Sequence, residues 1–277
     1  MRRTGTLSHP RAVSRIATGL LIVILLLLPV LYVVMIAFES PSHFLKSPLS
    51  LPTSPDVSNF SQAWSSADLA RELLNTVLYS VVAAGIATAL ALLIAFPIAR
   101  RLIRGSGMLY GWLAIGLFLP LSIIPLFIEA HWLGLFNNQI GYILLHVEPG
   151  MPLGVVLLTA FIASVPYELD EAAWMEGAGY LRYLARVVVP LTRPALLITF
   201  LYAMLNVWND IIGPVVLLSD PSLFPVTRGI YSFFGSNESQ WTVLAAAIVI
   251  ASLPLVVLFA VSQRQLLRAA VAGSVKG

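Results

Sequence analysis

The stretch DEAAWMEGAGYLRYLARVVVPLTRP, residues 170–194, lies between two long apolar runs and differs from both in composition. Its 25 residues include three acids, three arginines, two glycines and two prolines. Small residues gather in its first half, and charged residues flank them. Such a segment predicts a polar connection that lies outside a membrane while its apolar neighbours cross one.

The composition of the rest of the chain agrees with this prediction. The 277 residues are 58% hydrophobic and only 10% charged, and the mean hydropathy is +0.89. Because a soluble domain carries roughly 25% charged residues, there is too little charge here to cover a water-facing surface. We therefore expect an all-α integral membrane protein surrounded by lipid, and the net charge of +3 is no sign of a nucleic-acid partner.

Cysteine is absent from the sequence. This absence excludes a disulfide framework, a thiol nucleophile and zinc–thiolate or iron–sulfur sites.

Six apolar stretches are long enough to cross a membrane as helices. The first has 23 residues, too many for the core of a signal peptide, so we expect it to be retained. The fourth is interrupted by Glu148-Pro149-Gly150. The predicted spans are residues 16–38, 76–98, 108–128, 140–165, 194–218 and 241–262, and together they make residues 1–277 a single transmembrane domain.

The distribution of basic residues predicts the orientation. If both ends are cytoplasmic, the inside segments hold 13 of the 16 Lys and Arg, and the outside segments hold only Lys46, Arg71 and Arg228. The positive-inside rule requires such an asymmetry, and an odd number of spans would destroy it. We expect a multi-pass protein of the bacterial cytoplasmic membrane with a cytoplasmic tail at residues 263–277.

Residues 166–190, which we call the elbow, form the second cytoplasmic loop of this arrangement. Its acids fall in the first turns of a predicted helix, where negative charge suits the helix dipole, and glycines end that helix. A second short helix is expected to end at Pro190, and Pro194 begins the fifth span.

Two interpretations of the elbow follow from its residues. Ala172, Ala173, Gly177 and Ala178 leave backbone accessible to another protein surface, and the charged flanks would orient that surface. Alternatively, the elbow is an ordinary solvated loop whose charges face water. The residues alone favour neither.

The elbow also resembles the EAA signature of permease subunits of bacterial ABC importers. That signature reads Glu-Ala-Ala, three variable residues, Gly-Ala, and a Leu-Pro or similar pair further along. Glu176 stands where the sugar-importer branch usually has aspartate. The matching positions in this chain are Glu171, Ala172, Ala173, Gly177, Ala178 and Pro190.

Three other stretches resemble the second permease of maltose-type carbohydrate importers. They are NFSQAW…LLNTV at residues 59–77, VWND at 207–210, and GSVKG at 273–277. The C-terminal tail departs from the family pattern, because alanines stand where an earlier glycine belongs. The resemblance covers nearly the whole chain in matching order.

The resemblance implies a type I ABC importer permease fold in which the elbow is the coupling helix. Glu171 would contact a cleft of a cytoplasmic ATPase subunit, and Gly177 would permit the turn. The tail would reach the ATPase dimer through Gly273, Lys276 and Gly277. Implied partners are a second permease subunit in a heterodimer, an ABC ATPase dimer and an extracytoplasmic sugar-binding protein. ATP and Mg would be bound by the ATPase subunits, with no cofactor bound by this chain and no catalysis performed by it.

A polar cluster near the middle of the fifth predicted span is the candidate substrate pathway. It comprises Asn206, Trp208, Asn209 and Asp210. Polar groups inside a membrane are costly and usually face a bundle interior or a wet cavity. Amides, a carboxylate and an indole suit a sugar, although hydrogen bonding between spans is the alternative role.

The small residues of the second span have a different expected role. We predict a close helix-packing face formed by Ala83, Ala84, Gly85, Ala87, Ala89 and Ala91.

Rival functions have weaker support. The four histidines show no metal-ligand spacing, and no HExxH or GxSxG motif is present, which disfavours an intramembrane enzyme. A proton-coupled secondary transporter would have to work with Asp210 as its one acid deep in a span. No phosphate-binding GxxxxGK[ST] loop occurs, so an ATP-driven reading needs a separate ATPase. The sequence therefore predicts one permease subunit of a sugar importer, with alternating access as its mechanism.

Overall fold

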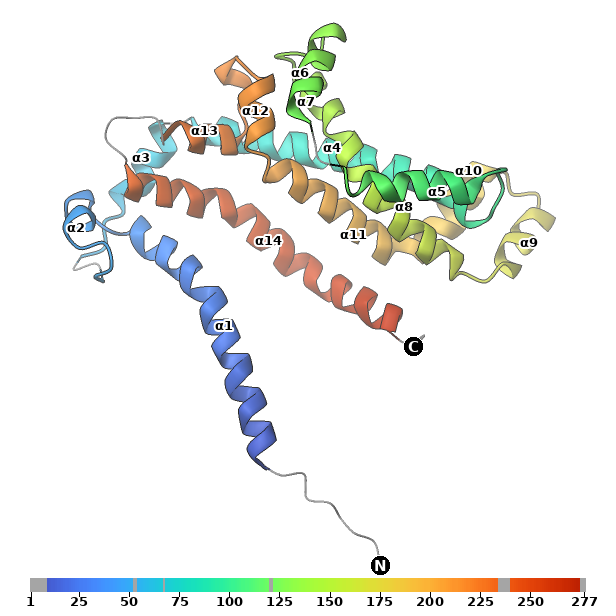
Figure 1. Ribbon diagram of the computed structural model, residues 1–277, viewed down its shortest axis with the longest axis horizontal. Coiled ribbons are helices and arrows are strands. Elements are labelled where there is room, and N and C mark those ends of the chain that lie inside the picture. The colour runs from blue at the N-terminus through green and yellow to red at the C-terminus, as the bar shows by residue number, and fades with distance from the viewer. Residues whose placement is uncertain (1–8, 52–53, 67, 120–121, 234–239, 275–277) are drawn as a thin grey trace, which may run out of the picture. The chain divides into compact units, whose positions relative to one another are not determined.

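The computed structural model describes residues 9–51, 54–66, 68–119, 122–233 and 240–274, and these residues form helices and turns with no strand (Figure 1). Within them, five helical runs are long and apolar enough to cross a membrane. The prediction of an all-α membrane protein is confirmed. The five runs are Thr18–Ala37, Leu69–Ala99, Gln139–Ala163, Tyr180–Trp208 and Trp241–Gln265.

The chain divides into two compact units, of which the first comprises residues 1–67 and 233–253. It contains α1 (His9–Ala37), α2 (Pro41–Lys46), α3 (Ser58–Ser66) and the beginning of α14 (Trp241–Ser274). Leucine, isoleucine and valine side chains along the middle of α1 are half or more exposed, as expected of a helix that faces lipid.

A buried asparagine organises the junction within this unit. The Asn59 side chain donates to the carbonyl oxygens of Ala37 (3.0 Å) and Glu39 (2.9 Å), and it accepts from the Thr242 hydroxyl (3.1 Å). The last carbonyls of a helix have no partner within it, so this side chain satisfies the end of α1 while tying it to α14.

The second unit comprises residues 68–232 and 254–277 and is built on three packed helices. These are α4 (Leu69–Ala99), α8 (Val147–Ala163) and α11 (Val189–Trp208), which lie against one another (Figure 1). Gly150 and Gly154 of α8 face alanines of α4 and residues of α11 so closely that an added Cβ at either would lie within 3.0 Å of a neighbour. Small residues thus set the spacing of this bundle.

The predicted small-residue face of α4 is present in part. Ala83, Ala84, Ala87 and Ala91 are fully buried, whereas Gly85 and Ala89 are exposed. The buried members recur every three or four residues, the spacing of one helix face.

Shorter helices surround the bundle. Among them, α6 contacts both α7 and α12. The shorter helices of this unit are α5 (Ser106–Gly116), α6 (Ile123–Trp132), α7 (Gln139–Leu145), α9 (Glu168–Met175), α10 (Tyr180–Tyr183), α12 (Ile212–Leu217) and α13 (Val226–Ser232).

The prediction of one continuous helix over residues 108–128 is wrong. The stretch is divided between α5 and α6, and the end of α5 tightens through bonds from the amides of Leu117, Phe118 and Leu119 to carbonyls three residues back. Pro120 and Pro125 lack the amide hydrogen that a continuous helix needs, and Pro125 lies in the first turn of α6, where that hydrogen would have no partner.

The predicted boundaries of the fifth span, residues 194–218, are also wrong. Pro190 ends no helix, because α10 continues through a π-helical turn, η1 (Leu184–Val188), into α11. Neither Pro190 nor Pro194 can donate to the carbonyl four residues earlier. The wider π turn, which includes Arg186, accommodates the crowding that the Pro190 ring creates, whereas Pro194 lies within α11. The run then ends at Trp208, and α12 follows a short break.

Three other predicted spans correspond to longer or joined helices. Span 76–98 is extended toward the N-terminus in α4, and span 140–165 corresponds to α7 and α8 with His146 between them. In α14 the helix continues past residue 262 to Ser274, so much of the predicted tail 263–277 is helical.

Candidate functional site

The first helix of the elbow is α9, and a glycine follows the end of this helix. Gly177 has φ +73°, its amide donates to the Trp174 carbonyl (3.0 Å), and the Ala178 amide donates to the Ala173 carbonyl (3.0 Å). This pair of bonds is the Schellman motif, in which a left-handed residue after the helix satisfies its last carbonyls. The Gly-Ala of the EAA pattern therefore has a local structural reason.

The two alanines of this motif face inward. Ala173 and Ala178 are half-buried and pack against a core cluster that includes Phe96 of α4 and Tyr183 of α10. An apolar contact between the residues on either side of the glycine commonly accompanies a Schellman motif. It holds the turn against the bundle.

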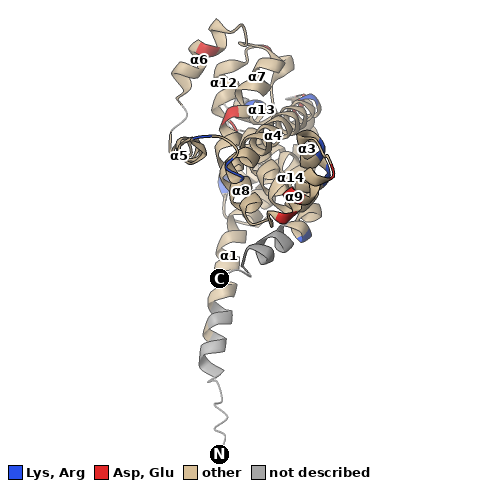
Figure 2. Ribbon diagram, turned by 90° about the vertical axis from the view of Figure 1, so that its right-hand side faces the viewer, with Lys and Arg blue, Asp and Glu red and all other residues tan. Residues whose placement is uncertain are grey.

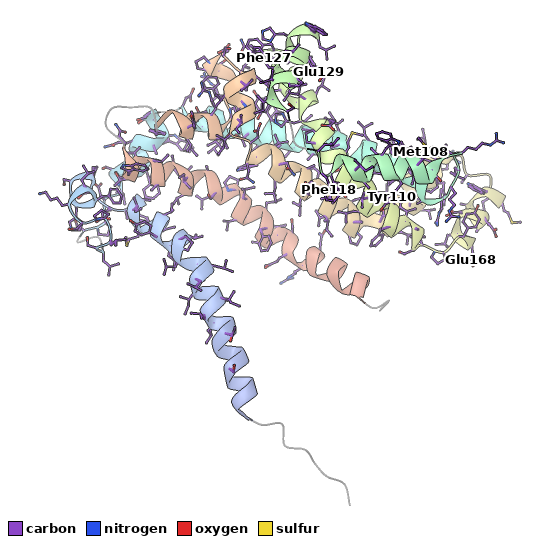
Figure 3. All side chains as sticks on the ribbon, in the orientation of Figure 1. Met108, Tyr110, Phe118, Phe127, Glu129 and Glu168 are labelled. Carbon is purple, nitrogen blue, oxygen red and sulfur yellow. The ribbon has the colours of Figure 1, made fainter. Side chains whose placement is uncertain are left out.

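The other EAA residues face outward. Glu171, Ala172 and Glu176 are exposed on α9 and its end, and Pro190 is exposed at the start of α11. Figure 2 shows the acidic residues of α9 in red, and Glu168, labelled in Figure 3, lies on the same helix. α9 lies at one end of the α4–α8–α11 bundle (Figure 1).

Two large apolar side chains stand among these outward charges. Met175 is 91% exposed and Leu181 is 70% exposed, while Arg182 and Arg186 beyond them are also exposed. Large apolar side chains exposed among charged ones are found at protein–protein contact sites. The elbow thus exposes large apolar side chains among its charged residues, while two of its alanines pack inward.

A buried ion pair joins the elbow to α4. The Arg100 guanidinium, at the C-terminal end of α4, contacts the Asp170 carboxylate through Nε (2.6 Å) and Nη2 (3.0 Å). Arg100 also donates from Nη1 to the Val165 carbonyl (3.0 Å), and the Tyr183 hydroxyl donates to Asp170 Oδ1. The Asp170 side chain is fully buried, and that of Arg100 is 5% exposed.

The predicted contacts of the C-terminal tail are described only in part. Gly273 lies in the last turn of α14. Lys276 and Gly277 lie outside the described residues.

The predicted substrate-pathway cluster separates into three environments rather than lying in the middle of a helix. Asn206 and Asn209 are exposed near the end of α11, and each donates to the carbonyl four residues earlier, 2.8 and 2.9 Å away. Trp208 is 3% exposed within the core of the second unit. Its ring is therefore covered by protein in this conformation.

Asp210 follows α11 and lies at the centre of a hydrogen-bond network. Its Oδ2 contacts His146 Nε2 (2.8 Å) and accepts from the Tyr142 hydroxyl (3.2 Å), and its Oδ1 accepts from the Gly213 amide (3.0 Å). A Cβ at Gly213 would lie 2.0 Å from Oδ2, so any other residue there would displace the Asp210 carboxylate from this network. The network joins two helix breaks, one between α7 and α8 and the other between α11 and α12.

Asn206 also lines a cavity of 330 Å³ together with Glu148, Tyr202 and Ser122 among other residues. Cavities of this size with a few polar groups are of the kind that hold small ligands. Within the described residues, no three His, Asp or Glu side chains converge in a way that could hold a metal ion.

Sequence reasoning missed four residues of these sites. Arg100 was counted only as a cytoplasmic charge, Asp170 only as one of several acids, and His146 and Tyr142 were not connected with Asp210. The partners are 64 to 70 positions apart in the chain, so no local pattern marks them. The only available signal is the i, i+4 spacing of Tyr142 and His146, which places both on one helix face.

Known proteins match this chain over most of its length. The family described as "Binding-protein-dependent transport system inner membrane component" matches residues 87–270. The diacetylchitobiose uptake permease NgcG of Streptomyces coelicolor is 32% identical over 274 residues, covering 97% of this chain and 89% of the relative. The melibiose/raffinose/stachyose import permease MelC of Bacillus subtilis is 32% identical over 222 residues, covering 79% and 80%.

A solved structure shares the fold. A chain of a bacterial ABC transporter that imports the polysaccharide alginate superposes with a TM-score of 0.81 at 22% identity, covering 94% of this chain and 99% of that one. The expected type I permease fold is confirmed, and these findings give no support to a self-contained secondary transporter. This multi-pass membrane protein belongs to the inner-membrane permease components of binding-protein-dependent ABC transport systems.

Proposed function

We propose that the chain is one permease subunit of a bacterial carbohydrate importer and that it carries a disaccharide or other oligosaccharide. Relatives named for diacetylchitobiose and for melibiose, raffinose and stachyose support this substrate class. The subunit would form half of the translocation pathway, and a second permease subunit would form the other half. An extracytoplasmic sugar-binding protein would deliver the sugar, and both termini would be cytoplasmic.

The outward face of the elbow is the observation that carries the coupling role. Met175 and Leu181 expose apolar surface to water between charged residues, which costs free energy unless a partner covers it. The cytoplasmic ATPase subunit is the partner that an ABC permease requires. Glu171 and Glu176 would supply polar contacts on the same exposed face of the elbow, and the tail with Gly273, Lys276 and Gly277 would reach the ATPase dimer.

In this proposal the chain performs no chemistry of its own. ATP and Mg would be bound and ATP hydrolysed by the ATPase dimer, and this chain would bind no cofactor. Closure of the ATPase dimer would move the elbow, and the cavity of the translocation pathway would open to the outside to receive the sugar. Hydrolysis would then return it to the inward-open state. Such alternation needs packed elements with discrete alternative positions.

The sugar pathway would include the cavity at the end of α11. Asn206 and Glu148 line it, and amide and carboxylate groups pair well with sugar hydroxyls. Asn209 and Asp210 follow Asn206 by three and four residues and would contribute to the same pathway. The buried Trp208 would support these residues from behind rather than stack on the sugar.

The test is co-purification of the tagged chain from native membranes with its partners, comparing wild type with Gly177→Arg. We expect wild type to retain an ATPase and a second permease, and the variant to retain the permease and lose the ATPase. Gly105→Arg is the matched control. Gly105 has φ +81°, open space around its Cβ position and a predicted cytoplasmic location, so the variant carries the same backbone strain outside the elbow.

The proposal fails if wild type brings down no ATPase. It also fails in its coupling part if Gly177→Arg retains as much ATPase as Gly105→Arg does.

A further inference from the structure

The elbow has an inner anchor as well as an outer face. Asp170 lies in the same first turn of α9 as the exposed Glu168 and Glu171, but its carboxylate is fully buried against Arg100. The family pattern begins at Glu171 and includes neither partner. The family pattern therefore does not explain why this pair is present and buried.

The geometry of the pair is that of a rigid connection. Two nitrogens of one planar guanidinium face two oxygens of one carboxylate, at 2.6 and 3.0 Å. Nη2 donates a hydrogen bond to Oδ1, whereas Nε and Oδ2 are close enough for an ion pair but are not aligned as a hydrogen bond. Because Nη1 also donates to the Val165 carbonyl, the planar guanidinium is held at two of its nitrogens, which fixes its orientation as a lysine in its place would not. The pair thus sets the angle at which α9 leaves the bundle.

Four segments meet at these two side chains. Arg100 caps the end of α4 and holds the Val165 carbonyl in the turn after α8, while Asp170 belongs to α9. The Tyr183 hydroxyl donates to Asp170 from α10, and the rings of Tyr180 and Tyr183 pack edge-on against Phe96 of α4, with centroids 5.5 and 5.8 Å apart. A displacement of α9 therefore cannot leave α4 and α10 in place without breaking buried contacts.

The connection continues along α11 to the candidate sugar pathway. α10, η1 and α11 form one helical run from Tyr180 to Trp208. At 1.5 Å per residue, the run separates Tyr183 from Trp208, two residues before Asp210, by about 38 Å. The buried pair lies at one end of the run, and the Asp210 network lies at the other.

Burial explains why the pair suits transmission rather than simple stabilisation. A buried ion pair contributes little net stability compared with apolar packing, but breaking it leaves a charge without a partner in a low-dielectric place. Intermediate positions of α9 are thus costly, and the elbow and α4 move together or not at all.

We propose that Arg100, Asp170 and Tyr183 form the joint that transmits displacement of α9 to α4 and α11, with Arg100 and Asp170 as positioning residues for energy coupling. This inference rests on the proposed role of the elbow as the ATPase contact. It assigns the inward side of the elbow a function distinct from that of its exposed residues.

The test uses the purified transporter with all its co-purifying subunits and a reporter at the far end of the helical run. Because the chain has no cysteine, Ile212→Cys, 57% exposed at the start of α12, accepts an environment-sensitive fluorophore at one position of this chain. The complex that contains the unsubstituted chain gives the background labelling. Mg-ATP with orthovanadate traps the ATPase dimer, and the resulting fluorescence change is measured.

In Asp170→Asn we expect the ATPase to remain bound while the nucleotide-driven change at position 212 is reduced, because the loss of one hydrogen bond to a charged group shifts the underlying equilibrium constant by about tenfold or more. Tyr183→Phe keeps the ring and loses only the hydroxyl, so a smaller fall is expected. Asp68→Asn is the matched control, because the Asp68–Arg71 pair (3.1 Å) is 57% exposed on both sides and should leave the signal unchanged.

A wild-type fluorescence change in both Asp170→Asn and Tyr183→Phe would overturn the joint. So would loss of the ATPase in Asp170→Asn together with a normal signal in Tyr183→Phe, since the pair would then only hold α9 in shape. The proposed function fails separately, through retention of the ATPase by Gly177→Arg.

Discussion

At the scale of single residues, Gly177 ends α9 with a backbone conformation that side-chain-bearing residues disfavour. Its φ of +73° costs an L-residue about 1 kcal/mol or more. We expect Gly177→Ala to lower the stability of the purified protein by about 1 kcal/mol, because no atom lies within 4 Å of the added Cβ and only the backbone is strained. Thermal denaturation followed by tryptophan fluorescence measures the change.

Gly179 provides the comparison two residues away. Its φ of −65° and ψ of 156° suit any residue, and its Cβ position is also open. Gly179→Ala should leave stability unchanged or raise it slightly through the unfolded state. Equal midpoints for the two alanine variants would contradict the role given to the left-handed turn.

The residue scale also marks the limit of prediction from sequence for the candidate sites. Gly177 was foreseen because a glycine that ends a helix is a local signal. The pairing of Asp210 with His146, and of Asp170 with Arg100, is created by packing between distant segments. Their chemistry was visible in the sequence, but their proximity was not.

At the scale of elements, α8 packs between α4 and α11 through glycines. A Cβ at Gly154 would lie 2.6 Å from Thr199 Cγ2 and 2.9 Å from Ala91 Cβ. We expect Gly154→Ala to destabilise the protein by about 1–3 kcal/mol, because the three helices must move apart to admit the methyl group. The thermal midpoint in detergent reports the loss.

Gly85→Ala serves as the control for this substitution. Gly85 lies on the exposed side of α4 with no atom within 4 Å of its Cβ position, so alanine should raise helix stability by about 0.5–1 kcal/mol. If Gly154→Ala were as stable as Gly85→Ala, the close packing of α8 would be excluded.

The sequence predicted which segments are helical more accurately than it predicted where those helices end. Long apolar runs predicted α1, α4 and α14, because length and hydropathy suffice for a span. The ends of α11 were misplaced because prolines were taken as boundaries, whereas a π turn carries the helix past Pro190. By contrast, Pro120 and Pro125 accompany a real break, which divides the third predicted span between α5 and α6.

At the scale of the whole molecule, this division makes the number of membrane crossings a question for experiment. The charge asymmetry requires an even number of spans if both ends are cytoplasmic. Five helical runs within the described residues are long enough to cross alone, so a sixth crossing must be supplied by α5 and α6 together. Their broken helix would cross only where protein satisfies the interrupted backbone.

Two single-cysteine variants of the cysteine-free chain decide this question in intact cells. Leu45, 72% exposed on α2, lies in the predicted external loop, and Met175, 91% exposed, lies in the elbow, which is predicted to be cytoplasmic. Between them are α4, the run Gln139–Ala163, and the α5–α6 segment.

If α5 and α6 cross, three crossings separate the two positions. A membrane-impermeant maleimide added outside should then label Leu45→Cys at once and Met175→Cys only after the cells are opened. Labelling of both from outside would mean two crossings, would place the elbow beyond the reach of a cytoplasmic ATPase, and would remove the physical basis of the coupling proposed for it.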